Sequence, residues 1–498
     1  MDNITSLDRI MTIRDYFMLG FGSMVGVGWC VAINDWISVG GGVIITVITF
    51  LIVTLMIIPI GLCYAEMCPA LPVAGGVLAY SYKAFGKKIA FLTGWLALLA
   101  YINVMPWESI YINNVFNYLF PQLMEGTPIY ILGGAPIYTK SLLLGLGLSF
   151  VMIYINWRGT KLASEVQNAC CYLMIGGAII VAVFAFVKCD PSNLLPLHRP
   201  LLGKSSASIG ACMIAVVAMA PFHFSGFDTI CQGAEEGEKD IDYSKLGKVI
   251  VVGIVATGVY YSLMMMSAGV AYPTDDFVGL KRPSICYMFI VLYPGLLGHI
   301  LYVITLITAL AGLFSTWNGF YIAGARLCLG MGRARLLPRA FEKIHPKHRT
   351  PVGGNILFGI ACLAGPFIGI GWINPISIIG SFGFVICWFF TALSCWKISI
   401  DYPDLRRPFK MPGGTIMMKI ACVSSILMSL ICVLPSSPGY MGNVAMGYFV
   451  VWMIFGVVIY GAFRKYRNAI PESERIATLF EGMPGEKRNR IYKCVSKQ

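Results

Sequence analysis

The stretch Gly22-Ser23-Met24-Val25-Gly26-Val27-Gly28-Trp29 places three glycines in an apolar segment that runs from about residue 16 to residue 37. A glycine inside a helix costs roughly 1 kcal/mol relative to alanine. At membrane depth, non-helical backbone is tolerated only where protein covers it or where it lines a wet cavity. The stretch therefore predicts a membrane helix broken near its middle, whose free N–H and carbonyl groups can hold an anion and a cation. The alternative is that the glycines only let a neighbouring helix pack closely.

The composition excludes a soluble globular protein. The 498 residues are 57% hydrophobic and 12% charged, with a mean hydropathy of +0.74. This charged fraction is about half of the usual value for soluble domains. The 16 cysteines are scattered through apolar segments without metal-type spacing, so we interpret them as small core residues. The sequence offers no nucleophile–base constellation and no phosphate-binding glycine loop outside the bilayer, which argues against an enzyme.

Apolar windows of roughly 20 residues predict the membrane spans. There are twelve, near residues 14–37, 42–68, 90–119, 140–157, 166–187, 207–231, 247–272, 287–328, 353–371, 374–396, 415–434 and 443–463. The eighth window is too long for one span, so it must contain part of a loop at its start.

Positive charge orients these spans. If the N-terminus is cytoplasmic, only six of the 37 Lys and Arg residues lie outside, namely Lys140, Lys188, Arg199, Lys204, Lys281 and Arg282. Because cytoplasmic loops of membrane proteins carry the excess of Lys and Arg, we expect both termini in the cytoplasm. The same topology explains the net charge of +13 without a nucleic-acid partner. Residues 1–13 are then a cytoplasmic N-terminus, and 464–498 a mobile or surface-lying cytoplasmic tail.

A second interruption falls in the sixth span, at Ala220-Pro221-Phe222-His223-Phe224-Ser225-Gly226-Phe227-Asp228. Pro, Gly and a carboxylate are hard to accommodate in one continuous helix. Spans one and six occupy corresponding positions in two five-helix halves, residues 14–187 and 207–396. Matching broken helices indicate an inverted-repeat transporter. We therefore predict an all-α polytopic membrane protein with twelve transmembrane helices, a 5+5 inverted repeat with broken helices 1 and 6, and two further helices in 415–463.

Four stretches in this order carry a family resemblance. They are Gly22 to Gly28; Tyr64-Ala65-Glu66-Met67 with Leu71 to Gly76, Tyr80 and Ala84-Phe85-Gly86; Asn156 to Lys161 with Val166-Gln167-Asn168; and Gly324-Ala325-Arg326-Leu327 through Leu337-Pro338 to Thr350-Pro351-Val352. Together they resemble the amino acid–polyamine–organocation (APC) superfamily of permeases, which have the LeuT-type fold. The resemblance covers roughly residues 10–460.

The resemblance implies a substrate site between spans 1, 3, 6, 8 and 10, reached alternately from each side of the membrane. By position, the amides of Val27 and Gly28 receive a substrate carboxylate, and the carbonyls of Met24 and Ser225 receive its amino group. Phe222 becomes an aromatic gate and Trp317 a pocket-lining aromatic, while Trp29 and Gly226, which belong to the two breaks, are also assigned as substrate contacts. The chemistry agrees, since N–H groups at the start of a half-helix suit an anion.

Ionisable groups at membrane depth are functional candidates by default. Asp228 could bind a substrate amine or carry a proton, or it could cap N–H groups freed by the break. Glu108, next to Trp107, could recognise a substrate ammonium by charge, with a cation–π contact from the indole, or it could form a structural pair. Asp35 is interpreted as a rim residue and His223 as a satisfied core histidine.

The residues beside Asp35, Asn34 and Trp36, depart from the usual family pattern. That departure leaves room for an amine other than an ordinary amino acid.

A candidate ion site also follows from the resemblance. Sodium-coupled relatives of this fold imply that the carbonyls of Gly22 and Val25 and the hydroxyls of Ser315 and Thr316 hold Na⁺. The alternative is ordinary helix hydrogen bonding by these hydroxyls. Where many proton-coupled members have a lysine in span five, this chain has Met174. We therefore favour Na⁺ as the coupling ion, with H⁺ through Asp228 or Glu108, or uncoupled exchange, as alternatives.

The sequence thus predicts a plasma-membrane permease that moves a small amino acid or related amine by alternating access, without a cofactor. A non-transporting ligand sensor with a permease fold remains the alternative of a different class. The basic loop Arg333 to Lys347 could contact anionic membrane lipid. Nothing in the sequence indicates the oligomeric state.

Overall fold

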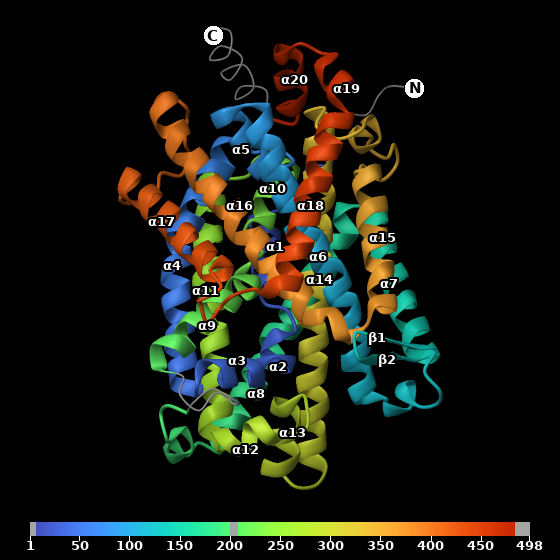
Figure 1. Cartoon of the computed structure of the whole chain (residues 1–498), viewed down its shortest axis with the longest axis vertical. Helices are drawn as coiled ribbons and strands as arrows, with labels where there is room; N and C mark the ends of the chain where they lie inside the picture. Colours follow the sequence, from blue (N-terminus) through green and yellow to red (C-terminus); the bar gives the residue numbers. More distant parts are fainter. Residues whose placement is uncertain (1–5, 200–207, 484–498) are drawn as a thin grey trace.

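A computed structural model describes residues 6–199 and 208–483, and Figure 1 shows them as a bundle of long helices. The longer helices are α4 (Val43–Ala70), α6 (Lys87–Leu119), α7 (Thr139–Arg158), α8 (Thr160–Val187), α9 (Ile209–Phe224), α11 (Tyr243–Ala271), α14 (Leu296–Arg333), α15 (Val352–Ile368), α16 (Ile373–Asp401), α17 (Gly414–Val433) and α18 (Gly442–Ala462).

The shorter helices are α1 (Ile13–Met24), α2 (Gly28–Val31), α3 (Ile33–Gly40), α5 (Gly76–Phe85), α10 (Thr229–Gln232), α12 (Thr274–Gly279), α13 (Ser284–Leu292), α19 (Arg464–Asn468) and α20 (Glu472–Leu479). Single 3-10 turns are η1 (Pro121–Met124), η2 (Pro191–Leu194), η3 (Ala234–Glu236), η4 (Arg339–Glu342) and η5 (Ile370–Trp372).

The predicted fold class, a polytopic helical membrane protein, is confirmed. Among the described residues, ten helices are long and apolar enough to cross a membrane, and the bent segment from Ile13 to Gly40 makes an eleventh. The ninth predicted window contains α15, which has only 17 residues, so the count of twelve spans stays a prediction. The eighth window does contain a loop at its start, because α13 ends at Leu292 and α14 begins at Leu296.

Both predicted breaks leave helical geometry. In the first span, α1 ends at Met24 and α2 begins at Gly28. The helix axis then turns by 77° between the segments Ile13–Val31 and Ile33–Gly40. In the sixth span, α9 ends at Phe224 and α10 begins at Thr229.

One element departs from the all-helical prediction. Between α6 and α7, β1 (Tyr130–Leu132) pairs antiparallel with β2 (Ala135–Ile137), with Leu132 opposite Ala135. The turn residues Gly133 and Gly134 have φ of +59° and +78°. Two consecutive positive φ angles are what a tight two-residue hairpin needs, and glycine adopts them without strain. The short strands carry no span-length apolar signal, which is why the apolar windows missed them.

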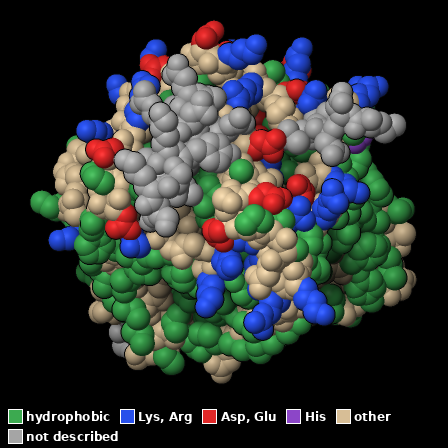
Figure 2. Space-filling model, turned by 90° about the horizontal axis from the view of Figure 1, so that it is seen from above, with side chains coloured by type: hydrophobic (Ala, Val, Ile, Leu, Met, Phe, Trp, Pro, Cys, Tyr) green, Lys and Arg blue, Asp and Glu red, His purple; other side chains and the backbone are tan. Residues whose placement is uncertain are grey.

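Charged side chains gather at one end of the bundle. Figure 2 looks down on this end and shows Lys, Arg, Asp and Glu across it, with hydrophobic side chains along the flanks below. Both described chain ends meet here, because the guanidinium of Arg9 donates to the carbonyl oxygen of Gly482 at 2.5 Å. We call this end the termini face.

The segment 464–483 packs on the termini face through α19 and α20. Its side chains Leu479, Phe480 and Met483 are buried in the main hydrophobic core. The fully buried Arg475 donates to the carbonyl oxygen of Arg467. The described part of the predicted tail is therefore anchored by apolar contacts, whereas residues 1–5 and 484–498 of the predicted terminal segments lie outside the described residues.

We expect Phe480→Ala to release this segment. Truncating a buried phenylalanine costs about 3–5 kcal/mol, which is large for a docking contact made by two short helices. Limited proteolysis of the purified protein should then cleave within 464–483 many times faster than in the wild type. Glu474→Ala, at an exposed position of the same helix, is the matched control. Equal cleavage rates for the two variants would contradict the anchoring role of Phe480.

Candidate substrate site

The two breaks touch through their backbones. Gly226 has a φ of +129°, and a Cβ built on it would lie 2.6 Å from the carbonyl carbon of Ser23 and 2.7 Å from the nitrogen of Met24. Real Cβ atoms essentially never come this close to backbone, so only glycine fits. The hydroxyl of Thr229 also lies 3.3 Å from that of Ser23. The predicted pairing of the two interruptions is thus a direct backbone contact.

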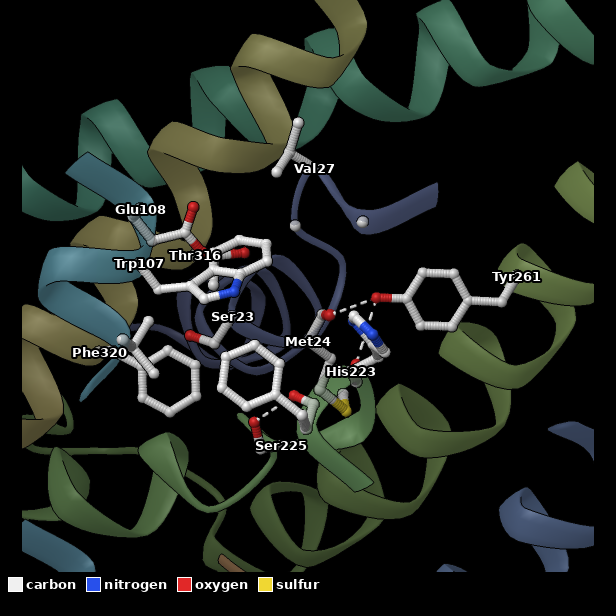
Figure 3. A pocket seen from close by; sticks show the side chains of 14 residues that line it. Ser23, Met24, Val27, Trp107, Glu108, His223, Ser225, Tyr261, Thr316 and Phe320 are labelled. Carbon is white, nitrogen blue, oxygen red and sulfur yellow. Dashed lines mark hydrogen bonds between the residues drawn. The ribbon is translucent and has the colours of Figure 1, made fainter. Parts of the chain in front are cut away.

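Tyr261 on α11 joins the two half-helices. Its hydroxyl lies 2.7 Å from the carbonyl oxygen of Met24, at the end of α1, and 3.2 Å from that of His223, near the end of α9. A helix end leaves its last carbonyls without partners inside the helix. The single hydroxyl proton of Tyr261 is thus shared between the two ends, with the shorter contact to Met24 (Figure 3). Sequence reasoning missed this role, because a tyrosine in an apolar span has no distinguishing spacing.

Helix α14 closes over the first break. A Cβ on Gly312 would lie 2.7 Å from the carbonyl oxygen of Gly26, so the missing side chain lets the two segments meet. The hydroxyls of Ser315 and Thr316 donate to the carbonyl oxygen of Gly22 at 2.9 and 3.0 Å. Three of the four predicted ion ligands therefore lie together.

The glycines of the first span have different roles. Gly22 lies inside α1, and a Cβ on it would lie 2.4 Å from the sulfur of Cys171 and 2.5 Å from Nε2 of Gln167 on α8. For Gly22, the alternative of close helix packing therefore applies. Gly26 lies in the non-helical segment and Gly28 begins α2. The N–H group that starts a helix has no acceptor within it, and the binding of an anion at Gly28 stays a prediction.

A small cavity of about 20 Å³ lies between the two breaks (Figure 3). It is lined by Ser23, Met24, Gly26, Val27 and Gly28 of the first break, Val104, Trp107 and Glu108 of α6, Phe222, His223 and Ser225 of the second break, Tyr261 of α11, and Thr316 and Phe320 of α14. Of the predicted substrate contacts, Met24, Val27, Gly28, Glu108, Phe222 and Ser225 are among them. We call this space the central cavity.

Glu108 is the acidic group of the central cavity. Its side chain is 1% exposed, and its Oε2 atom is buried without a hydrogen-bond partner among the described residues. A Cβ built on Gly26 would lie 3.7 Å from the Oε1 atom of Glu108 and 2.8 Å from the hydroxyl oxygen of Thr316. A buried carboxylate without a partner is costly, so either a bound proton or a cation in the cavity would compensate its charge.

Aromatic rings form one wall of the central cavity. The ring of Phe222 lies 5.4 Å from that of Trp107, centroid to centroid, and packs against Gly380 of α16. The indole N–H of Trp107 donates to the hydroxyl of Ser377 at 2.5 Å. Phe222 thus sits where the predicted aromatic gate would sit, and its movement stays a prediction.

Two predicted aromatics do not line the cavity, which corrects the sequence-based assignment. The indole N–H of Trp317 points to the sulfur of Cys362 on α15, at 3.1 Å. Successive helix residues are rotated by about 100°, so Trp317 turns away when Thr316 faces the cavity. Trp29 packs edge-on against Tyr260, with ring centroids 6.1 Å apart.

Asp228 also lies outside the cavity. Its carboxylate accepts from the hydroxyl of Tyr101 at 2.5 Å and from the N–H of Gly226 at 3.2 Å. Gln232 donates to the same tyrosine hydroxyl at 3.0 Å. This is close to the capping alternative, except that the capped N–H belongs to the break and not to α10. Gly226 itself serves the backbone contact and does not line the cavity.

Three further residues singled out in the sequence are Asp35, Met174 and Val25. Asp35 forms a bidentate ion pair with Arg282 at 2.5 and 3.0 Å, and both side chains are about half exposed. Met174 lies beside Gly312, because a Cβ there would be 3.2 Å from its sulfur. Val25 donates its N–H to the carbonyl oxygen of Phe21, and its side chain is fully buried.

Two buried ion pairs close the termini face. Glu236 pairs with Arg326 at 2.8 Å, and Glu235 pairs with Arg333 at 2.6 Å. Burial alone would raise the pKa of Glu235, but the charge and hydrogen bonds of Arg333 and the N–H of Ala74 outweigh it. The pKa of Glu235 is therefore below its ordinary value of 4.5. These pairs fix the end of α14 to the segment that follows the second break.

Comparison with known proteins agrees with this architecture. The profile of the amino acid permease family matches residues 12–461. Similar proteins include the branched-chain amino acid permease BcaP of Bacillus subtilis (strain 168), 26% identical over 473 residues, which are 93% of this chain and 95% of that protein. The methylthioribose transporter of the same organism is 25% identical over 482 residues, with the same coverage. The cationic amino acid transporter 7, chloroplastic, of Arabidopsis thaliana is 27% identical over 376 residues, 71% of this chain and 59% of that protein.

The match to permeases and transporters over nearly the whole chain indicates a membrane transporter and not an enzyme. The chain belongs to the amino acid permease family, as the match over nearly its whole length shows.

We expect Gly226→Ala to abolish ligand binding in the central cavity, because the two breaks touch at this residue. The positive φ costs a non-glycine residue of order 1–3 kcal/mol, and the new methyl group also overlaps the backbone of Ser23. The variant should unfold at a lower temperature and show no ligand-induced stabilisation. Gly176→Ala is the control, because a Cβ there meets nothing within 4 Å. A Gly226→Ala protein that binds ligand normally would refute the backbone contact.

We expect Glu235→Gln to destabilise the protein by about 3–5 kcal/mol, since it leaves Arg333 buried beside a neutral amide. A lowered carboxylate pKa contributes stability above the ordinary value, and this is lost as the pH falls through the folded pKa. Thermal unfolding of the wild type should therefore show a loss of stability below about pH 4.5 that is smaller in the variant. The double variant Glu235→Gln, Arg333→Gln should regain part of the loss. Identical pH profiles would argue against the ion pair.

Proposed function

We propose that the protein moves a small amino acid or related amine across the plasma membrane by alternating access, with both termini in the cytoplasm. The observation that carries this proposal is the unpartnered, buried carboxylate of Glu108 in the central cavity. A substrate ammonium would compensate this charge, and the indole of Trp107 would add a cation–π contact. The uneven distribution of Lys and Arg along the sequence, and the basic side chains at the termini face (Figure 2), support this orientation.

We further propose that Na⁺ drives the transport. The hydroxyl oxygens of Ser315 and Thr316 each lie within hydrogen-bonding distance of the carbonyl oxygen of Gly22, and oxygen ligands suit a hard cation. The nearby carboxylate of Glu108 would offset the charge of the ion. To receive it, both hydroxyls would turn their hydrogens away from the carbonyl of Gly22. The carbonyl of Val25 completes the proposed ligand set.

The similar proteins differ in the substrates for which they are named. The relatives are named for branched-chain amino acids, methylthioribose and cationic amino acids, and a further one for glutamate and serine. Their names therefore give no single substrate. The single carboxylate of Glu108 favours zwitterionic or cationic amino acids over glutamate, because a second negative charge would be repelled.

The test is uptake into proteoliposomes that contain the purified protein. We expect amino acid uptake driven by an inward Na⁺ gradient and not by a K⁺ gradient, and Thr316→Ala should remove the Na⁺ dependence. Glu108→Gln should raise the substrate KM about 30-fold or more, because losing one partner of a buried charge pair costs about 2–5 kcal/mol. Glu165→Gln, an exposed carboxylate on α8, is the matched control.

Other outcomes select the alternatives. Uptake that follows a pH gradient, ignores Na⁺ and loses its pH dependence in Glu108→Gln would replace Na⁺ by H⁺. Uptake that needs only a substrate on the opposite side would identify an exchanger. Saturable binding without any flux would identify a sensor with a permease fold.

A further inference from the structure

His223 faces the central cavity from α9, although a lone histidine in an apolar span is typical of the core. Its Nε2 atom accepts a hydrogen bond from the indole N–H of Trp36 at 3.1 Å. The two rings meet at an angle of 60° with centroids 4.5 Å apart. Trp36 is 1% exposed, so the donor is held in place by its packing. The hydrogen bond fixes which ring nitrogen carries the proton.

An imidazole nitrogen that accepts a hydrogen bond has no proton of its own. In the neutral ring, the proton must then be on the other nitrogen, Nδ1. This nitrogen makes no hydrogen bond to any described residue. It lies beside the first residue of α2, since a Cβ on Gly28 would be 3.0 Å from it. An N–H donor therefore lies at the cavity wall, at the point where α2 begins.

The central cavity is polar at two opposite sides. Figure 3 shows Glu108 with Trp107 on one side, and His223 with Tyr261 on the other. Glu108 offers a buried, unpartnered carboxylate, and His223 offers a free N–H. A ligand with an ammonium and a carboxylate complements both sides at once, whereas a simple amine leaves the second donor unused.

We infer that the Nδ1–H of His223 donates a hydrogen bond to the carboxylate of the substrate beside Gly28, and that this contact makes the site select amino acids over amines without a carboxylate. Trp36 is the positioning residue, because it keeps the proton on Nδ1. The inference rests on the proposed function and specifies its substrate class. A neutral donor suits this place, because it binds the carboxylate without adding a positive charge that would repel the substrate ammonium.

The experiment compares pairs of ligands that differ only in the carboxylate. Purified wild type and variants are titrated with L-leucine and 3-methylbutylamine, and with L-lysine and 1,5-diaminopentane, by ligand-induced thermal stabilisation. His223→Ala should weaken the binding of both amino acids at least 10-fold, which corresponds to about 1.4 kcal/mol, and leave the binding of both amines within twofold. His223→Gln, which keeps a side-chain N–H donor, should restore most of the affinity.

Trp36→Phe should produce the same selective loss to a smaller degree. The imidazole of His223 stays in place, but without the indole N–H its proton is no longer kept on Nδ1. Trp388→Phe is the matched control, since that buried indole N–H has no partner. His299→Ala, at an exposed histidine, controls for loss of an imidazole elsewhere. The ligand-free melting temperature of each variant reports whether it folds, and His223→Gln keeps the test valid where His223→Ala is unstable.

Two results would overturn the inference. An equal loss for amino acids and amines would make His223 a structural residue of the cavity wall. Unchanged amino acid binding in a folded His223→Ala protein would remove it from the site, while the proposed function would stand. A wild type that binds none of the four ligands would instead overturn the proposed function, and the role of His223 with it.

Discussion

The contact between the two interrupted helices is the constraint on which the rest of this structure depends. A broken helix inside a membrane leaves polar backbone groups without partners, and each one costs several kcal/mol in hydrocarbon. Here each break supplies surface for the other, because Gly226 lets its backbone touch that of Ser23 and Met24. Tyr261 then supplies one hydroxyl to both helix ends. The cavity exists because the two breaks can be satisfied only next to each other.

In this arrangement, residues that are neighbours in the sequence have different surroundings. Thr316 faces the cavity, whereas Trp317, one residue later, packs between helices. Phe222, His223 and Ser225 line the cavity, whereas Asp228 is turned toward Tyr101 and caps the break. A helix changes direction by about 100° per residue, so neighbours in sequence serve different surfaces. Acidic groups of similar appearance in the sequence therefore have different surroundings: Glu108 is buried without a partner, Asp228 is fully hydrogen-bonded, and Asp35 is ion-paired near solvent.

Buried ion pairs and the segment 464–483 hold the termini face together. The buried pairs of Glu235 with Arg333 and Glu236 with Arg326 hold the end of α14 to the segment after the second break. Segment 464–483 covers this region and places Gly482 directly over the carboxylate of Glu235. The alternating access that we propose would require such contacts to form and break in turn, while the ligand groups stay in place. Buried ion pairs suit this use, because they are specific in geometry and contribute little net stability.

The sequence by itself determined the class of protein, most of the membrane-spanning segments and the positions of both breaks. These features follow from apolar length and from glycine and proline, which act locally along the chain. The sequence also pointed to Glu108, because a carboxylate is rare in an apolar span. Only the tertiary structure decided which side chains share the cavity. Tyr261 and His223 have no distinguishing spacing, Trp317 faces away for reasons of helical phase, and Asp228 faces away because it accepts hydrogen bonds from Gly226 and Tyr101. Side-chain direction depends on the relative rotation of helices that are distant in sequence, and packing between them sets that rotation.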